Sequence, residues 1–309
     1  MKIAAIGDVN VDLIASVKCL PKKGKQVITN DFEIHCGGCA ANFAFACTKL
    51  GAEVKLFGKL GDDLFGRHIR ATLEENRVDV SNVSLSDSNE KTGSTVAIVQ
   101  GSERSFITHR GTNATFSVSD VDCKKLKVDL VHLPSFFLLE ALQHDYGKII
   151  SSVDGLKSID PGWDPFGWGP EKLRQLKDIL PNMDIFFSNL DEARRITGKR
   201  EPHQIIEKLL KLGIKVIALK MGEMGSMVSD GKKAKRLAAF DVNTVDTTGA
   251  GDAFDAGFVI AYLSGKELIE CAIFANATAA LSIEGIGWST YSTLENVNDF
   301  LRSHKVKGL

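Results

Sequence analysis

The sequence is poor in several features that mark specialised classes of protein. Its 309 residues include six cysteines, seven prolines and 7% aromatic residues, and the formal net charge is −1. A charge so close to zero gives little attraction to polyanions, so we expect no nucleic-acid partner. No window approaches about 18 uncharged apolar residues, and the N-terminus, MKIAAIGDVNVDL, lacks a basic segment followed by a long apolar one. We therefore expect a cytoplasmic protein with no membrane partner.

The six cysteines are too few and too scattered for a disulfide framework in a chain of this length. Cys36 and Cys39, in HCGGCAAN beside His35, have the spacing that begins a zinc site or a redox dithiol. Zinc needs four ligands, but the sequence has no second C-x-x-C and no H-x-x-x-H. A dithiol at the start of a helix fits the local pattern. The favoured alternative is that Gly37 and Gly38 matter, because consecutive glycines before a helix open its backbone N–H groups to a polar ligand.

Strand-like and helix-like segments alternate along most of the chain. Apolar runs such as KIAAIG, VDLVHL and KVIALK are typical of buried strands, and LFGRHIRATLEEN, FFLLEALQHDYGKII and HQIIEKLLKLG are typical of helices. Repeated strand-then-helix units predict an α/β fold in one domain, 1–309, with a doubly wound, mainly parallel central sheet and helices on both faces. Two regions do not fit this rhythm: about 8–35 is typical of extended pieces broken by PKKGKQ, and about 92–111 contains two alternating segments that predict a hairpin. We expect them to form a small β-sheet lid over the edge of the main sheet.

The late segment DTTGAGDAFDAGF contains a glycine-rich turn that opens an apolar helix. The successive N–H groups of Gly249, Ala250 and Gly251 can point at one anion, with the carboxylate of Asp252 beside them. Helix capping by Asp252 is the simpler interpretation, but a capping residue normally precedes the helix. The turn is not a Walker A loop, which needs Gly-Lys-Ser/Thr, and it lies far from the first strand, where a dinucleotide fingerprint would be. The pattern predicts a phosphate cradle with a carboxylate at its edge.

This segment resembles the C-terminal signature of the ribokinase-like (PfkB) carbohydrate kinases. GGCAAN followed by KLGDDLFG is similar to the N-terminal signature of the same family, and GDVNVD, GTNA, NLDE and KMGEMG match further motifs. The resemblance covers essentially the whole chain. It implies an ATP-dependent kinase that transfers the γ-phosphate to a hydroxyl of a sugar, with ATP and Mg²⁺ as cofactors and a doubly wound sheet with a β lid.

The resemblance also implies a role for each matching residue. Asp252 matches the catalytic base that accepts the hydroxyl proton, and the N–H groups of 249–251 would hold the charge on the transferred phosphoryl group. The matching residues on the sugar side are Asn10, Asp12, Gly37, Gly38, Asn42 and, by a looser alignment, Glu140. Those on the nucleotide side are Asn189, Lys220, Gly222, Gly225 and Asn276.

Two cation sites are implied in the same way. Glu192 lies one turn after Asn189, and the family's N-x-x-E motif orients water molecules on Mg²⁺, an ion that dehydrates reluctantly. The same spacing is that of an N-cap with its capping-box glutamate, and one pair of residues can serve both roles. Asp246, with carbonyls around Gly285 and Ser289, resembles the monovalent-cation site that some members fill with K⁺.

The molecule that accepts the phosphate is the least determined part of the prediction. The two glycines, Asp12 and the few aromatic residues of the lid favour a neutral sugar that resembles ribose or fructose. A nucleoside is one alternative, since its base could stack on Phe106 or a tryptophan. A 2-keto-3-deoxy sugar acid is another, with Arg104 and Arg110 as candidate partners of the acid. A nicotinamide-dependent oxidoreductase would also use a doubly wound sheet, but the first strand lacks G-x-G-x-x-G.

The lid carries a prediction about assembly as well. One face of such a small sheet is left apolar, and relatives often bury it by pairing two lids. Closed two-fold symmetry is the commonest form of self-association. We therefore expect a homodimer formed through the lid.

Overall fold

The structure, a computed structural model, describes residues 1–29, 31–86, 89–100 and 103–306. Within them, a sheet of nine strands has the order β13-β12-β11-β10-β9-β8-β1-β4-β5. The strands are β1 (Lys2–Ile6), β4 (Glu53–Leu60), β5 (Asp79–Leu85), β8 (Leu130–Pro134), β9 (Leu156–Asp160), β10 (Ile185–Asn189), β11 (Val216–Lys220), β12 (Ser226–Ser229) and β13 (Ala234–Leu237). Neighbours from β5 to β11 pair in parallel, and β12 and β13 add antiparallel strands at one edge.

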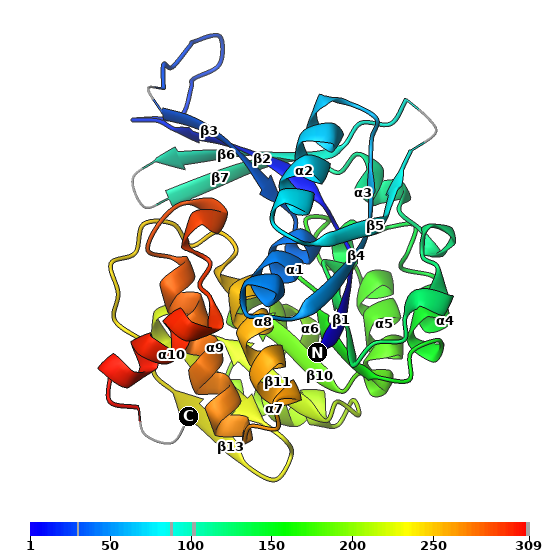
Figure 1. The fold of residues 1–309 in the computed structure, drawn as a ribbon, viewed down its shortest axis with the longest axis vertical. Coiled ribbons are helices and arrows are strands. Elements are labelled where there is room, and N and C mark those ends of the chain that lie inside the picture. The colour runs from blue at the N-terminus through cyan, green and yellow to red at the C-terminus, as the bar shows by residue number, and fades with distance from the viewer. Residues whose placement is uncertain (30, 87–88, 101–102, 307–309) are drawn as a thin grey trace.

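Helices cover both faces of this sheet (Figure 1). One face carries α1 (Cys39–Lys49), α2 (Leu64–Glu75), α8 (Ala250–Leu263), α9 (Leu268–Ser282) and α10 (Leu294–Ser303). The other carries α4 (Tyr146–Ser151), α5 (Pro170–Ile179), α6 (Leu190–Thr197) and α7 (Pro202–Leu210). In β1, Ile3 and Ala5 belong to the first core and Ala4 and Ile6 to the second. A strand that is apolar on both sides needs cover on both, and the predicted doubly wound fold is confirmed.

A second, smaller sheet stands apart from the large one (Figure 1). Its strands are β2 (Asn10–Ser16), β3 (Asp31–Gly37), β6 (Gly93–Gln100) and β7 (Glu103–His109), in the order β3-β2-β6-β7. The central β2–β6 pair is parallel and the two outer pairs are antiparallel. The predicted small sheet is therefore present. It is joined closely to the large sheet, because β2 begins soon after β1 ends and β3 leads through Gly38 into α1. The short helix α3 (Thr112–Thr115) follows β7.

The segment FFLLEALQHDYGKII differs from the predicted long helix. The structure has a 3₁₀ turn at Phe136–Leu138, and α4 begins only at Tyr146. Phe136, Phe137, Leu139 and Leu142 are all fully buried. Consecutive buried side chains cannot share one face of a helix, so this segment fills the second core with side chains on several sides. In the described part of the chain, no helix is both long enough and apolar enough to span a membrane.

Asp63 ties α2 to the start of the small sheet. Its carboxylate caps α2 by accepting from the N–H of Gly66 at 2.8 Å, and it accepts from the N–H of Thr92 at 2.9 Å and the Thr92 hydroxyl at 2.7 Å. Thr92 directly precedes β6. Although desolvation opposes it, these hydrogen bonds hold the pKa of Asp63 below its ordinary value. One charged side chain thus connects the two sheets.

Asp63→Ala should lower the free energy of unfolding by about 1–2 kcal/mol, the usual cost of losing a helix N-cap, as measured by urea denaturation. Because the folded-state pKa is lowered, the stabilisation is present above the unfolded pKa of about 4 and is lost as the pH falls through the folded value. Wild type and variant should therefore converge at acid pH. Asp62→Ala is the control, since Asp62 forms an exposed pair with Arg67. Equal stability of the two variants would contradict the capping role.

Candidate active site

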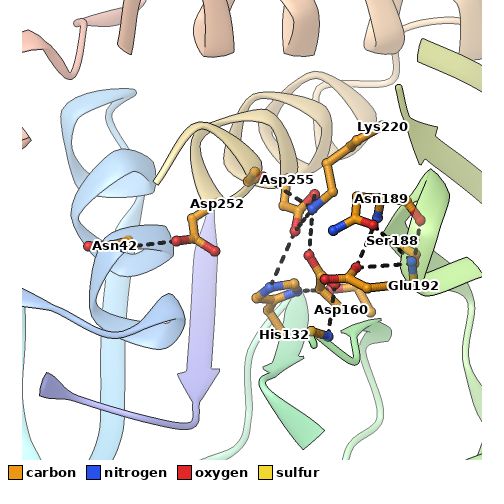
Figure 2. Close-up of polar contacts among 12 residues, drawn as sticks. Asn42, His132, Asp160, Ser188, Asn189, Glu192, Lys220, Asp252 and Asp255 are labelled. Atoms are coloured by element: carbon orange, nitrogen blue, oxygen red, sulfur yellow. Dashed lines mark hydrogen bonds and ion pairs between the residues drawn. The ribbon is translucent and has the colours of Figure 1, made fainter. Parts of the chain in front are cut away.

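The predicted site residues gather where the carboxyl ends of the parallel strands meet the start of α8. Asp160 ends β9, Asn189 ends β10 and Lys220 ends β11. Asp252 lies in the first turn of α8, on the same edge of the sheet (Figure 2). In open α/β sheets this edge is where ligands bind, because the loops that leave the strands diverge there.

Asp252 is joined to Asn42 across 210 residues of sequence. The Nδ2 of Asn42, in α1, donates to Oδ2 of Asp252 at 2.8 Å, and both side chains are buried. Burial raises the pKa of Asp252 to about 7, while the Asn42 hydrogen bond and the charge of Lys220 oppose that rise. A carboxylate that titrates near neutrality can both accept a proton and release it again.

The turn before α8 has the geometry of an anion cradle. Gly249 is the N-cap residue, with φ of +76°, and within the described residues no side chain caps this helix. N–H groups in the first turn of a helix have no acceptor within that helix and can bind an anion. Of the three in the predicted cradle, that of Ala250 donates to the carbonyl of Thr247 at 3.3 Å. Asp252 sits inside the helix, which begins at Ala250, and not at the cap. A Cβ on Gly249 would also collide with the hydroxyl of Tyr291, which donates to the Gly249 carbonyl at 3.1 Å.

Asp12 and the Gly37–Gly38 pair meet at the base of the small sheet. A Cβ on Gly37 would overlap the Asp12 carboxylate, and Gly38, with φ of +92°, lies against the backbone carbonyl of Asp8. The glycines therefore make room for Asp12 and for the close approach of the Asp8 backbone. The start of α1 is not left open, because the N–H of Ala40 donates to Oδ1 of Asp8 at 3.4 Å. Burial raises the pKa of Asp12 to about 7, and the charges of Asp8 and Asp246 add to the rise.

Two residues predicted on the sugar side have partners of their own. Oδ1 of Asn10 accepts at 2.5 Å from Nδ2 of Asn113, which fixes the connection between β1 and β2. Glu140 is exposed, and its Oε2 pairs with Nη1 of Arg110 at 2.9 Å. The hydrogen bond from Arg110 lowers the pKa of Glu140. The side chain of Arg104 lies outside what the structure describes.

Lys220 is at the centre of a buried charge cluster that the sequence analysis did not anticipate (Figure 2). Its Nζ lies 2.5 Å from Oδ2 of Asp160, 3.0 Å from Oδ1 of Asp255 and 3.5 Å from the carbonyl of Gly251. Desolvation opposes the charge, but the two carboxylates raise the pKa of Lys220 above its ordinary value. Lys220 is therefore a fixed cation directly behind the cradle. One residue in the sequence could have indicated this cluster: Asp255, which lies one turn after Asp252 in the same glycine-rich motif.

His132, on β8, closes the cluster from the interior. Its Nδ1 hydrogen-bonds Oγ of Ser158 at 2.9 Å, and its Nε2 lies 4.0 Å from Oδ2 of Asp255. Burial lowers the pKa of His132 to about 3, so the ring is neutral at physiological pH. Burial also raises the pKa of Asp255. The cluster thus relies on Lys220 for its positive charge.

Asn189 and Glu192 form a reciprocal capping box at the start of α6. Oδ1 of Asn189 accepts from the N–H of Glu192 at 2.9 Å, and Oε2 of Glu192 accepts from the N–H of Asn189 at 3.0 Å. Burial, and then the charge of Asp160, raise the pKa of Glu192 to about 7. The buried carboxyls of Glu192 and Asp160 repel each other, and such a pair fits a hydrated Mg²⁺, an ion that prefers oxygen donors and keeps its water.

Three further predicted residues lie around the end of β13. Gly222 and Gly225 form the turn from β11 to β12 with φ of +57° and +83°, and a Cβ on Gly225 would collide with the carbonyl of Leu237. Asn276, on α9, donates from Nδ2 to the carbonyl of Ala238 at 3.1 Å. The turn and α9 therefore hold the same stretch of backbone from two sides.

The residues of the predicted monovalent-cation site come together through backbone hydrogen bonds. The N–H groups of Val245 and Asp246 donate to the carbonyl of Ile283 at 2.8 and 3.2 Å. Val245, Gly285 and Ser289 line one open cleft of about 750 Å³. The side chain of Asp246 is buried, and its Oδ1 accepts from the N–H of Thr248 at 2.6 Å. A buried carboxylate is an oxygen donor of the kind that such a cation prefers.

Cys39 begins α1, as a reactive dithiol would require, but the two C-x-x-C thiols lack the lowered pKa of such a pair. All six cysteines are free. Burial raises the pKa of both the Cys36 and the Cys39 thiols well above the ordinary value, and the nearby carboxylates of Asp12 and Asp252 raise them further. Thiolates are the reactive and metal-binding form, so this environment favours the interpretation in which the glycines carry the function.

Alkylation should separate these interpretations. In the native protein at pH 8, we expect iodoacetamide to modify Cys19, which is exposed, and to leave Cys36, Cys39 and the buried Cys47 unmodified until the protein is unfolded. Peptide mass spectrometry measures each site, and Cys19 is the internal control. Native Cys36 or Cys39 reacting as fast as Cys19 would show that a reactive dithiol exists here.

Comparisons with known proteins agree with this geometry. A model of the pfkB family carbohydrate kinases matches residues 1–294. The chain is 30% identical to a protein of Archaeoglobus fulgidus named as an uncharacterized sugar kinase. The alignment of 243 residues covers 78% of this chain and 95% of that protein. A ribokinase II candidate of E. coli, solved with ATP and Mg²⁺, has a TM-score of 0.87 and 26% identity, over 98% of this chain and 99% of that one. The ribokinase of Arabidopsis thaliana, complexed with ribose and ATP, has a TM-score of 0.83 and 26% identity, over 97% and 98%.

The matched region includes every element that builds the site, from β1 to the start of α10. The cradle, the carboxylate beside it and the small sheet thus lie within one recognised domain. The chain belongs to the pfkB family of carbohydrate kinases, which are ATP-dependent phosphotransferases.

Proposed function

We propose that this chain transfers the γ-phosphate of ATP to a hydroxyl of a neutral, ribose- or fructose-like sugar, with Asp252 as the base. The observation that carries the proposal is the juxtaposition of Asp252 with the uncapped start of α8, so that a base and an anion cradle lie within one helical turn. Phosphoryl transfer needs a positioned nucleophile and neutralised phosphate charge, and these two features supply both. The Arabidopsis ribokinase complexed with ribose and ATP supports the choice of acceptor.

Each residue of the candidate site has its own role in the proposed reaction. Asn42 holds Oδ2 of Asp252, and the acceptor hydroxyl gives its proton to Oδ1 as its oxygen attacks the γ-phosphorus. The bond from that phosphorus to the β,γ-bridging oxygen breaks, and ADP leaves. The N–H groups of 249–251 hold the charge on the transferred phosphoryl group, and the cation of Lys220 adds positive potential behind them. Asn189 and Glu192 would hold Mg²⁺ through water, and the bound ion would neutralise phosphate charge. The E. coli neighbour solved with ATP and Mg²⁺ supports the use of this ion. A K⁺ ion bound at Asp246 would stiffen the segment before the cradle.

Charge favours a neutral acceptor over an acidic one. Asp12 is an acceptor-only group that can take two sugar hydroxyls, and Asp8 and Asp246 lie close enough to raise its pKa. An acidic sugar would add another negative charge to these carboxyls. Arg110, the described arginine that could offset that charge, already pairs with Glu140.

A coupled ADP-release assay over neutral sugars, sugar acids and nucleosides tests the proposal. We expect a neutral sugar to give the highest kcat/KM, and Asp252→Asn to lower kcat at least about 10²-fold, the usual size of a general-base contribution. KM for ATP should change little, because the cradle is backbone. The base must be deprotonated, so wild-type activity should fall as the pH drops below about 7.

Asp191→Asn is the matched control, because Asp191 pairs with Arg194 at the surface of α6 and should retain wild-type turnover. If Asp252→Asn kept most of its turnover on the best acceptor, the proposed mechanism would be wrong. A nucleoside or a sugar acid as the best acceptor would overturn the substrate class alone.

We also propose that two copies of the chain pair through the small sheet. The strand register places Ile34, Leu13, Val96 and Ile107 in one row across it, and places Asp12 with Thr95 and Thr108 in the adjacent row, on the other face. Ile34 and Ile107, at the two ends of the apolar row, are 49% and 65% exposed. Leu13, inside the row, is partly buried against the first core, so the exposed apolar surface on the face away from Asp12 lies at the two ends of the row. Exposed apolar side chains on one face of a sheet support an interface there.

Light scattering at micromolar concentration should give the mass of a dimer for the wild type. Ile107→Lys should give the mass of a monomer, since it places a charge in the apolar row. Leu294→Lys is the control, because Leu294 is 44% exposed on α10, which packs on α9 and not on the small sheet, and this variant should remain dimeric. A monomeric wild type would exclude this assembly.

A further inference from the structure

Trp288 is linked to Asp252 through Asn42, and it lies between Gly285 and Ser289, which the family resemblance assigns only to a cation site. It lies in the 3₁₀ turn Gly287–Thr290, after α9. Its Nε1 donates to Oδ1 of Asn42 at 2.9 Å, and Nδ2 of the same Asn42 donates to Asp252 at 2.8 Å. The indole ring stacks on Phe45, with ring centroids 4.2 Å apart and an interplanar angle of 19°. An unbroken chain of hydrogen bonds thus runs from Trp288 through Asn42 to Asp252.

The direction of this chain follows from what each group can donate. An indole N–H is a donor only, whereas an asparagine amide has an acceptor at one end and donors at the other. Opposite Trp288, Asn42 must therefore present Oδ1, which turns Nδ2 toward Asp252. The flipped amide would set Nδ2 against the indole N–H and Oδ1 against the carboxylate, so that both contacts would become repulsive.

We propose that Trp288 is a positioning residue for the base: its indole N–H sets the orientation of Asn42, which holds Oδ2 of Asp252 and directs Oδ1 to the acceptor hydroxyl. The inference rests on the proposed function, since it requires Asp252 to be the base. It assigns a role in the reaction to a tryptophan that makes no contact with Asp252 in the hydrogen-bond chain.

The packing around Trp288 gives it the rigidity that such a role requires. Asn42 and Phe45 lie three residues apart on α1 and so share one face of that helix, where a single indole contacts both. Tyr291, three residues after Trp288, stacks near Phe45 with centroids 5.6 Å apart and donates to the carbonyl of Gly249. One short segment therefore holds both the amide that orients the base and the turn that forms the cradle.

The electrostatic surroundings of Asp252 make the effect measurable. The charged or titratable groups that face it from neighbouring elements are Lys220, Asp160, Asp8, Cys39, Tyr291 and, on its own helix, Asp255. Burial raises the pKa of Asp252, and the hydrogen bond from Asn42 is the first of the effects that oppose the rise. An amide that no longer holds its orientation would let the pKa rise further. Activity that depends on the deprotonated base would then be lost at a higher pH.

Trp288→Phe tests the role, because phenylalanine keeps a ring on Phe45 and removes the N–H. With a saturating concentration of K⁺, the acid limb of kcat/KM should move up by about one pH unit, which corresponds to about a tenfold loss below the limb, as for a hydrogen bond to a charged group. Activity on the alkaline plateau should change much less. Trp163→Phe is the matched control, since Trp163 is half exposed in the loop after β9 and should leave the profile unchanged.

A double-mutant cycle separates positioning from packing. If Trp288 acts through Asn42, then adding Trp288→Phe to Asn42→Ala should change kcat/KM no further. A purely structural role would lower the melting temperature, leave the acid limb in place and give additive losses, and that result would overturn the proposal.

Two further outcomes keep this proposal distinct from the proposed function. Retained turnover in Asp252→Asn would overturn both, whereas an inactive Asp252→Asn with an unshifted acid limb in Trp288→Phe would overturn the positioning role alone. A further test uses the wild-type protein, so it does not depend on whether a variant of Trp288 folds. In ¹⁵N-tryptophan spectra, the Trp288 indole N–H should exchange at least about tenfold more slowly than that of the exposed Trp163, and equal rates would contradict the hydrogen bond.

Discussion

The ion pairs that Lys220 makes with Asp160 and Asp255 are the interaction on which the active-site edge depends. Several carboxyls converge on this edge, and each would resist burial without a compensating charge. The Nζ of Lys220 meets Asp160 and Asp255 directly and lies 3.5 Å from the carbonyl of Gly251. It therefore holds together the ends of two strands and the first turn of α8. Replacing this cluster with apolar side chains would spare a desolvation penalty, so its presence is explained better by electrostatics at the cradle than by stability.

Close packing of α8 places the glycine-rich turn and Asp252 at the same edge of the large sheet. This helix is apolar on most of its surface and is buried between α1, α9 and the large sheet, as expected for a helix without a solvent face. A Cβ on Gly257 would collide with the Thr278 side chain of α9, so the two helices can approach closely only at a glycine. The position of Asp252 is thus set by packing along the whole helix and not by the local turn alone.

The pKa directions describe a site prepared for positive charge. Burial raises the pKa values of Asp12, Glu192 and Asp252 to about 7 in the chain alone. Groups shifted in this way lose protons more readily when a cation approaches, so bound Mg²⁺ would favour their charged forms. The proposed orientation of Asn42 by Trp288 would also favour the charged form of Asp252, because it offers that carboxylate a hydrogen-bond donor. Catalysis at this edge would then combine a backbone cradle with a base whose charge state responds to its ligands.

The doubly wound sheet, the small second sheet and the motif residues could all be predicted from the sequence, because apolar periodicity and glycine-rich turns are local properties. The sequence could not place Lys220 between Asp160 and Asp255, which come from separate strands and a helix and have no periodic relation. The prediction of one long helix over FFLLEALQHDYGKII was wrong, because tertiary burial of Phe136 and Phe137 outweighed helix propensity. The contact of Trp288 with Asn42 spans 246 residues, so only the folded chain could reveal it. Side-chain partnership across such distances is decided by the packing of α1, α8 and the segment after α9, for which no local pattern provides a signal.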